Sequence, residues 1–182
     1  MRCQEKQIKL KDGRYATFRS PLPEDSAEMI EFLRTCAGET DFILRYPEEC
    51  TETEAQEAAY LENINNSESG VMIVCVVAGK IAGNCQIAFH RRIKTKHRAS
   101  VAIGLKTQYW GLGIGTAMFE EMIELAGNYG VSQLELEFIE GNERAKALYE
   151  KMGFEIIAEK ADAIRLKDGT SLKEYTMVKK LK

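Results

Sequence analysis

The sequence predicts an α/β protein of the α+β kind, in which a central mixed, largely antiparallel sheet carries helices on both faces. Two segments with alternating polarity turn at Asp12-Gly13 and Asp168-Gly169, which is typical of antiparallel hairpins. The run 71–78 is apolar at nearly every position, as expected for a strand that is covered on both sides. Segments with apolar residues at helical spacing interrupt the strands and would supply the covering helices.

Local signals mark where the remaining elements begin and end. Thr51 and Glu54 have the spacing of a capping box, which predicts a helix start, and Gly79-Lys80 predicts a turn between two strands. The predicted helices are 24–36, 52–65, 114–129 and 143–151. The predicted strands lie within 7–19 and at 70–78, 80–89, 98–105, 132–139, 154–166 and 171–180.

Length and composition describe one globular domain, residues 1–182. The chain is 45% hydrophobic and 29% charged, and its three prolines form no linker-like cluster. A formal net charge of −3 gives no global indication of nucleic-acid binding. The first residues are charged, and the longest apolar run is too short to span a bilayer, so we expect a cytoplasmic protein without a membrane partner. Five cysteines without CxxC spacing argue against a disulfide framework and against a metal site.

A glycine-rich turn between the strand 98–105 and the helix 114–129 is the main candidate site. Its glycines, Gly111, Gly113 and Gly115, let backbone N–H groups approach a ligand without an intervening side chain. The first turn of a helix leaves N–H groups unpaired, so the segment predicts a phosphate cradle. No Walker lysine follows, and the GxGxG spacing differs from that of dinucleotide loops. A glycine turn without a ligand is the alternative that this motif alone leaves open.

Two motifs together resemble one family. The first is Gln108-x-x-Gly111-x-Gly113, which is similar to the Q/R-x-x-G-x-G/A signature of the GNAT superfamily of acyl-CoA-dependent N-acyltransferases. The second resembles the family's N-x-x-A-x-x-L-Y-x-x-x-G-F run and reads Asn142-x-x-Ala145-x-x-Leu148-Tyr149-x-x-Met152-Gly153-Phe154. The resemblance is specific over about 71–154 and implies a GNAT-like fold, with acetyl-CoA as the acyl donor.

The resemblance also assigns the contacts to this donor. Main-chain amides of the glycine loop would hold the CoA pyrophosphate, and the strand 102–105 would pair with the pantetheine arm beside a neighbouring strand that splays away. Asn142 would contact the pantetheine, although it is also a good N-cap for the helix that follows. The implied cofactor-binding residues are Ile103, Leu105, Gln108, Gly111, Leu112, Gly113, Ile114, Gly115, Thr116 and Asn142.

Acetyl transfer to an amine needs one group that removes a proton and one that donates a proton. An alkyl ammonium, with a pKa of about 10.4, must be deprotonated before it attacks the thioester to form a tetrahedral intermediate. Tyr149 matches the family tyrosine near the CoA sulfur and is the expected acid; a core tyrosine is the alternative. Glu137 matches the base of the enzymes that acetylate ribosomal-protein N-termini, and it shares a strand face with Glu135. A solvated glutamate, with a water chain as the base, is the alternative.

Two charged segments bear on the acceptor. The segment 39–57 holds seven acids and one base, which would attract a cationic amine or would simply be a solvated helix start. The segment 90–98 holds five Lys or Arg residues and both histidines, which indicates a charged hairpin tip more than a nucleic-acid site. We therefore expect acetyl transfer to a small amine or polyamine, without a nucleic-acid partner. A peptide N-terminus or lysine is the alternative acceptor, and a non-catalytic acyl-CoA sensor is the alternative class; a homodimer is compatible with the resemblance.

Overall fold

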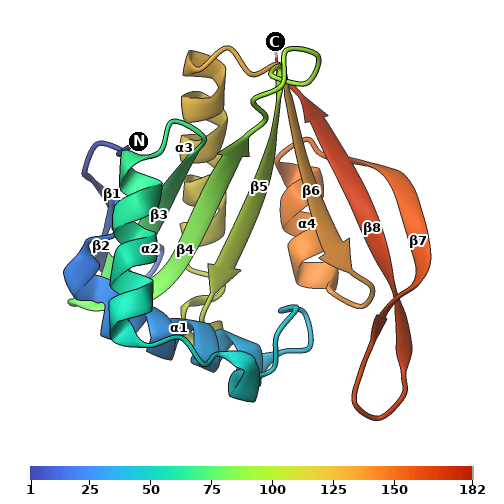
Figure 1. The fold of residues 1–182 in the computed structure, drawn as a ribbon, viewed down its shortest axis with the longest axis horizontal. Helices are drawn as coiled ribbons and strands as arrows, with labels where there is room; N and C mark the ends of the chain where they lie inside the picture. The colour runs from blue at the N-terminus through green and yellow to red at the C-terminus, as the bar shows by residue number, and fades with distance from the viewer. Residues whose placement is uncertain (182) are drawn as a thin grey trace.

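The computed structural model describes residues 1–181 and forms one sheet flanked by helices on both faces (Figure 1). Over these residues the sheet has eight strands in the order β1-β2-β3-β4-β5-β6-β8-β7, and of the neighbouring pairs only β5 and β6 run parallel. The predicted fold class is therefore confirmed. The strands are β1 (Lys6–Lys9), β2 (Tyr15–Arg19), β3 (Gly70–Val77), β4 (Lys80–Phe89), β5 (Arg98–Leu105), β6 (Gln133–Ile139), β7 (Glu155–Arg165) and β8 (Ser171–Lys180).

Helices α1 (Ser26–Glu39) and α2 (Glu54–Asn66) lie on one face of the sheet, and α3 (Ile114–Asn128) and α4 (Glu143–Lys151) lie on the other (Figure 1). Each pair covers its own set of buried apolar side chains, with Phe32 and Leu61 at the centre of the smaller set and Phe119 and Met122 in the larger one. Within the described residues, no helix is both long and apolar enough to cross a lipid bilayer.

The start of α2 differs from the prediction. Thr53, not Thr51, is the N-cap: its hydroxyl accepts from the Gln56 N–H at 3.3 Å, and the Gln56 side chain accepts from the Thr53 N–H at 2.9 Å. The predicted box of Thr51 and Glu54 is therefore wrong by two residues. The reciprocal bonds of Thr53 and Gln56 place the helix start there, and Glu52 instead forms an ion pair with Arg45 in the preceding loop.

The predicted hairpins are confirmed, with one small change. β1 pairs with β2 and β7 pairs with β8, each antiparallel around its Asp-Gly turn. β3 is buried at nearly every position, as its composition predicts. The turn from β3 to β4 is built on Ala78 and Gly79, which have φ of 49° and 75°, one residue earlier than the predicted Gly79-Lys80. Helix α4 has the predicted bounds, 143–151.

The sheet divides between β5 and β6. These strands pair only where Arg98–Ser100 faces Gln133–Glu135. Beyond this point β5 continues alongside β4 as far as Leu105, while β6 continues alongside β8 as far as Ile139. The two halves of the sheet therefore diverge, as the resemblance implies, and the gap opens toward the glycine loop and the loop after α1 (Figure 1).

Candidate functional site

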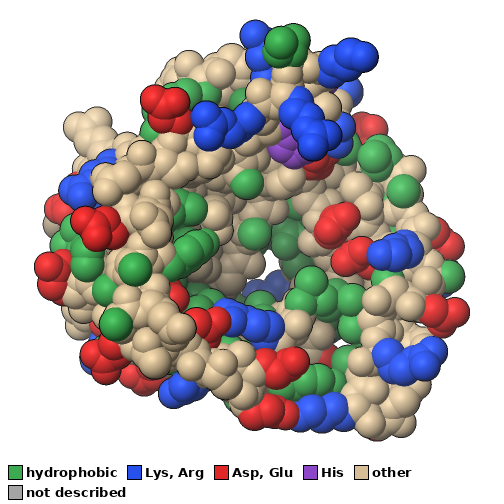
Figure 2. Space-filling view, in the orientation of Figure 1, with side chains coloured by type: hydrophobic (Ala, Val, Ile, Leu, Met, Phe, Trp, Pro, Cys, Tyr) green, Lys and Arg blue, Asp and Glu red, His purple; other side chains and the backbone are tan. Residues whose placement is uncertain are grey.

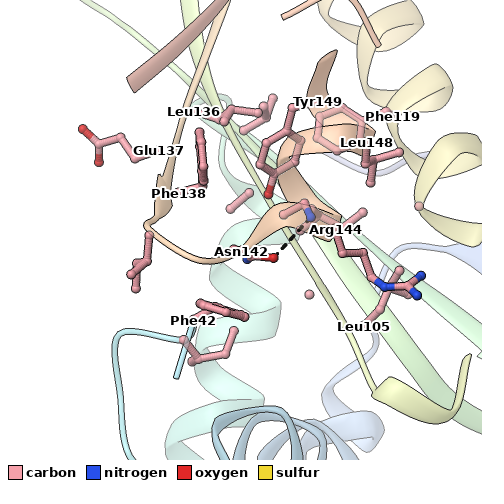
Figure 3. A pocket seen from close by; sticks show the side chains of 18 of the residues that line it. Phe42, Leu105, Phe119, Leu136, Glu137, Phe138, Asn142, Arg144, Leu148 and Tyr149 are labelled. Carbon is pink, nitrogen blue, oxygen red and sulfur yellow. Dashed lines mark hydrogen bonds between the residues drawn. The ribbon is translucent and has the colours of Figure 1, made fainter. Parts of the chain in front are cut away.

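A cavity of about 770 Å³ occupies the point where the sheet divides. Figure 2 shows a hollow between the two halves of the molecule, and Figure 3 shows the side chains that line the cavity. Its wall comes from β5, β6, β8, the glycine loop, α4 and the segment that follows α1. The predicted residues that the wall includes are Ile103, Leu105, Gly111, Gly113, Gly115, Thr116, Asn142, Glu137 and Tyr149.

The glycine loop begins α3 without a side-chain cap. Gly113 is the N-cap residue, and its φ of 92° favours glycine. The first hydrogen bond of the helix is donated by the Ala117 N–H to the Gly113 carbonyl, at 3.1 Å. The N–H groups of Ile114, Gly115 and Thr116 meet no acceptor within residues 1–181. Three unpaired N–H groups at the positive end of a helix form a site for an anion.

Helices α3 and α4 pack closely at Gly115. A Cβ atom on Gly115 would lie 2.9 Å from a methyl group of Leu148, closer than real side chains approach. By contrast, a Cβ on Gly111 would meet no atom within 4 Å, so this part of the loop has open space above it. The side chains of Gln108, Leu112 and Ile114 do not form part of the cavity wall. Gln108 is exposed and Ile114 is buried in the core, so only main-chain roles remain open to Ile114.

Lys11 borders the glycine loop, and the sequence motifs gave no indication of it. It lies in the turn between β1 and β2, where its N–H donates to the Leu112 carbonyl at 3.2 Å. Its side-chain carbons come within 3.8 Å of the place that a Cβ on Gly113 would occupy, and the residue lines the cavity. The N-terminal hairpin therefore brings a lysine to a loop that is about a hundred residues away in the chain.

Two cations of α4 lie on the other side of the same loop. The Lys151 ammonium donates to the Thr116 hydroxyl at 3.2 Å. The Arg144 guanidinium lies 4.9 Å from the ring centre of Trp110, whose indole N–H donates to the Leu105 carbonyl at 3.0 Å. Together with Lys11, these side chains make the surroundings of the unpaired N–H groups positive.

Tyr149 projects from α4 into the cavity, and its hydroxyl points into the open space (Figure 3). Its ring packs edge-on against Phe119, with the ring centres 5.5 Å apart, and the residue is only 7% exposed. Over the described part of the chain the hydroxyl has no hydrogen-bond partner. Burial raises the pKa of Tyr149 to about 12, so the phenol keeps its proton at neutral pH.

Glu137 lies on the opposite face of β6, and its carboxylate points away from Tyr149 (Figure 3). It shares that face with Glu135, as predicted, but the two side chains have different surroundings. Glu135 forms an ion pair with Arg98 and lies 3.1 Å from the His90 ring nitrogen. Glu137 is exposed and makes no ion pair with any residue from 1 to 181. Of the two carboxylates, Glu137 is therefore the one available to a ligand.

Asn142 caps α4 with its side chain, which accepts from the Ala145 N–H at 3.2 Å (Figure 3). It also lines the cavity, so both predicted roles remain compatible with its position. Phe42, from the loop after α1, crosses the gap and would lie 3.7 Å from a Cβ on Gly141, the residue before this cap. Sequence reasoning missed Phe42, because nothing local connects it to a turn a hundred residues later.

The segment that follows α1 also contacts the β7–β8 hairpin, beside a second and smaller pocket. The Tyr46 hydroxyl accepts from the Lys167 N–H at 3.0 Å, which joins the loop after α1 to the tip of the β7–β8 hairpin. The Lys167 ammonium also lies 4.0 Å from the centre of the Tyr46 ring and forms an ion pair with Glu48. No group of three or more His, Cys, Asp or Glu side chains between residues 1 and 181 is arranged to hold a metal ion.

The open sheet could hold an extended acyl carrier, and the helix N-terminus with its surrounding cations could bind the phosphates of that carrier. These features are typical of an acyl-CoA-dependent acyltransferase. Residues 32–154, more than half of the chain, match the model of the acetyltransferase (GNAT) family. The chain therefore belongs to the GNAT family of acetyltransferases, for which acetyl-CoA is the acyl donor, as the two motifs predict.

Individual relatives agree with this assignment. The L-amino acid N-acetyltransferase AaaT of Escherichia coli (strain K12) is 31% identical over 85 residues, 46% of this chain and 52% of that protein. The match thus spans about half the length of this curated relative. A GNAT-family acetyltransferase of Streptococcus pneumoniae has a TM-score of 0.85 and 28% identity, over 91% of this chain and 99% of its own. A phosphinothricin acetyltransferase of Sinorhizobium meliloti, in complex with acetyl-CoA, shares the fold at a TM-score of 0.78 and 21% identity, over 91% and 88%.

Proposed function

We propose that this chain transfers the acetyl group of acetyl-CoA to the primary amine of a small molecule, a small amine or a polyamine. One observation carries the proposal. Tyr149 is only 7% exposed, its hydroxyl is protonated at neutral pH and has no hydrogen-bond partner in residues 1–181, and the residue lines the cavity that also reaches the glycine loop. A hydroxyl in this state is suited to give a proton to a leaving thiolate.

The glycine loop would bind the pyrophosphate of the donor. The unpaired N–H groups of Ile114, Gly115 and Thr116 support this role, because an anion at a helix N-terminus satisfies groups that otherwise lack acceptors. Lys11 and Lys151 would add charge-assisted contacts to the phosphates. The bound donor supplies an activated acyl group.

The free edge of β5 would hold the pantetheine arm. Residues 102–105 pair with β4 on one side and with no strand of the described chain on the other. The backbone N–H and C=O groups that point away from β4 are therefore available to an extended ligand, apart from the Leu105 carbonyl, which accepts from Trp110; the ligand would add to the half-sheet like a strand. Ile103, Leu105 and Asn142 border the same space and would position the arm.

Glu137 would act as the base. Its carboxylate and the Tyr149 hydroxyl lie on opposite faces of β6, so the amine would bind at the unpaired edge of this strand, with an ordered water carrying the proton to Glu137. The nitrogen then attacks the thioester carbon. A C–N bond forms, the C–S bond breaks, and the sulfur takes the proton of Tyr149.

A small acceptor is favoured over a polypeptide. The carboxylates of Glu137 and Glu174 in the cavity wall, which are unpaired within residues 1–181, favour a compact cationic acceptor. Peptide N-termini and lysine side chains remain the competing acceptors, because Glu137 matches the base of enzymes with that activity. The name of the Escherichia coli relative makes L-amino acids the third class to test.

The test is release of free thiol from acetyl-CoA in the presence of polyamines, aminoglycosides, amino acids and short peptides. Turnover with a small amine, and none with peptides, supports the proposal. Turnover with peptides alone would replace the small acceptor with a polypeptide. Binding of acetyl-CoA in a calorimeter, without thiol release from any amine, would instead indicate a module that senses acyl-CoA.

A further inference from the structure

We infer that the acceptor carries a second positive charge about 7 Å from its reacting nitrogen, and that Glu174 binds this second charge. The inference rests on the proposed function and narrows its substrate class to aliphatic diamines and longer polyamines. It is carried by the register of β6 and β8 and by the charges of the cavity wall.

The strand register places two carboxylates side by side. Glu137 is opposite Thr176, and Ile139 is opposite Glu174. Glu137 and Glu174 are therefore diagonal neighbours on one face of the sheet, about 7–8 Å apart at the backbone. Both residues line the cavity, and neither forms an ion pair within the described part of the chain. Two like charges at this spacing favour a ligand that neutralises both of them.

The Lys and Arg side chains of the cavity wall lie away from Glu137 and Glu174 or are paired with other residues. In the described chain these cations are Lys11, Arg98 and Arg144. Arg98 is paired with Glu135, with its Nε 3.1 Å from the carboxylate, while Lys11 and Arg144 lie at the glycine loop. Figure 2 shows acidic side chains along one border of the central hollow. Among residues 1–181, the acceptor side of the cavity wall thus holds unpaired carboxylates and no unpaired cation; Lys160, which is opposite Glu174 in the register of β7 and β8, does not line the cavity.

An independent feature of the same cavity indicates a polar ligand. The Tyr149 side chain is more than nine-tenths buried, yet its hydroxyl has no partner in residues 1–181 and points into this space. This hydroxyl faces the cavity and has no protein partner there, so it can form a hydrogen bond with a polar group of a ligand. With the reacting nitrogen between Tyr149 and Glu137, a chain of about four carbons would carry the second ammonium to Glu174.

The same charges would exclude acceptors that carry a carboxylate. The carboxylate of an amino acid would lie among Glu137 and Glu174 without a cation to pair with, and like charges at short distance repel. The site should therefore distinguish acceptors by the charge of the group at the end far from the reacting nitrogen. This selectivity differs from the one that the name of the Escherichia coli relative implies for that protein.

Three acceptors with the same spacer test the inference: putrescine, pentylamine and 5-aminopentanoate, which end in an ammonium, a methyl group and a carboxylate. The wild-type protein should show the highest kcat/KM with putrescine and the lowest with 5-aminopentanoate. Glu174→Gln should lower kcat/KM for putrescine about tenfold, mainly through KM, and leave pentylamine unchanged. Glu174→Lys should reverse the order of putrescine and 5-aminopentanoate.

The matched control is Glu155→Gln, which removes the same charge at the start of β7, away from the cavity wall. It should leave all three kcat/KM values unchanged, and thermal unfolding of each variant checks that it folds. Equal losses for putrescine and pentylamine in Glu174→Gln would overturn the inference, as would wild-type activity that ignores the distal group. If acetyl-CoA binds but no amine at all is acetylated, the proposed function is wrong, and the inference, which rests on it, is wrong as well.

Discussion

Replacing Tyr149 with Phe separates the catalytic role of this residue from its structural role. The change removes one hydroxyl and keeps the ring, which contacts Phe119 and Phe154 at 5.5 and 6.4 Å between ring centres. No hydrogen bond within residues 1–181 is lost, because the hydroxyl makes none there. The packing of α4 on the core should therefore survive the substitution.

The two roles predict changes of different size. The hydroxyl makes no hydrogen bond within residues 1–181 and faces the cavity, so Tyr149→Phe should change the free energy of unfolding by less than about 1 kcal/mol. General acid catalysis contributes roughly 10²- to 10⁴-fold, so kcat should fall by at least about a hundredfold. The Kd of acetyl-CoA should stay within about twofold, since the glycine loop is untouched.

Thiol release gives kcat, calorimetry gives the Kd of acetyl-CoA, and chemical denaturation gives the stability. Tyr175→Phe is the control, because it removes a hydroxyl from the ring that stacks on Phe138 at 5.1 Å and that does not line the cavity. A normal kcat in Tyr149→Phe would refute the role as an acid. A large loss of stability would refute the premise that the hydroxyl has no partner in the fold.

Three further changes test other parts of the site and the fold. Glu137→Gln should lower kcat and flatten the acidic limb of the pH–rate profile; an unaltered profile would exclude Glu137 as the base. Lys11→Ala should raise the Kd of acetyl-CoA about five- to tenfold by calorimetry, whereas Lys9→Ala on the same hairpin should not, and equal Kd values would contradict the phosphate contact. Burial, with a smaller effect of Glu52, raises the pKa of Glu57, so the folded protein binds this proton more tightly than the unfolded chain and stability falls as pH rises above the ordinary glutamate range. Glu57→Gln should therefore be more stable than wild type in urea at neutral pH, with the difference disappearing below about pH 4, and a constant difference would contradict this account.

Local signals predicted the elements whose ends depend on neighbouring residues. Helix α4 has the predicted bounds because Asn142 caps it from the adjacent position. The start of α2 was mispredicted because two Thr-led patterns compete there, and Gln56 completes the capping box with Thr53. Both patterns have capping-box spacing, so spacing alone does not distinguish them.

Local sequence patterns predicted even less of the candidate site. Glu135 and Glu137 have equivalent local sequence patterns. They differ because Arg98 and His90, from other segments of the chain, contact the Glu135 carboxylate. Lys11 contacts the glycine loop from a turn about a hundred residues earlier in the chain. Motifs identified the loop and Tyr149, whereas the charge balance of the cavity depends on strand register and on contacts between distant segments.

The division of the sheet also affects how long the protein survives. Beyond Ser100 and Glu135 the facing edges of β5 and β6 have no strand partner within residues 1–181. A donor that pairs with such an edge binds the folded chain and not the unfolded one, and at a hundred times its Kd it would add about 2.7 kcal/mol to stability. Proteases that act on transiently open chains would then remove the enzyme fastest when acetyl-CoA is scarce, so the supply of substrate would set the abundance of the enzyme that consumes it.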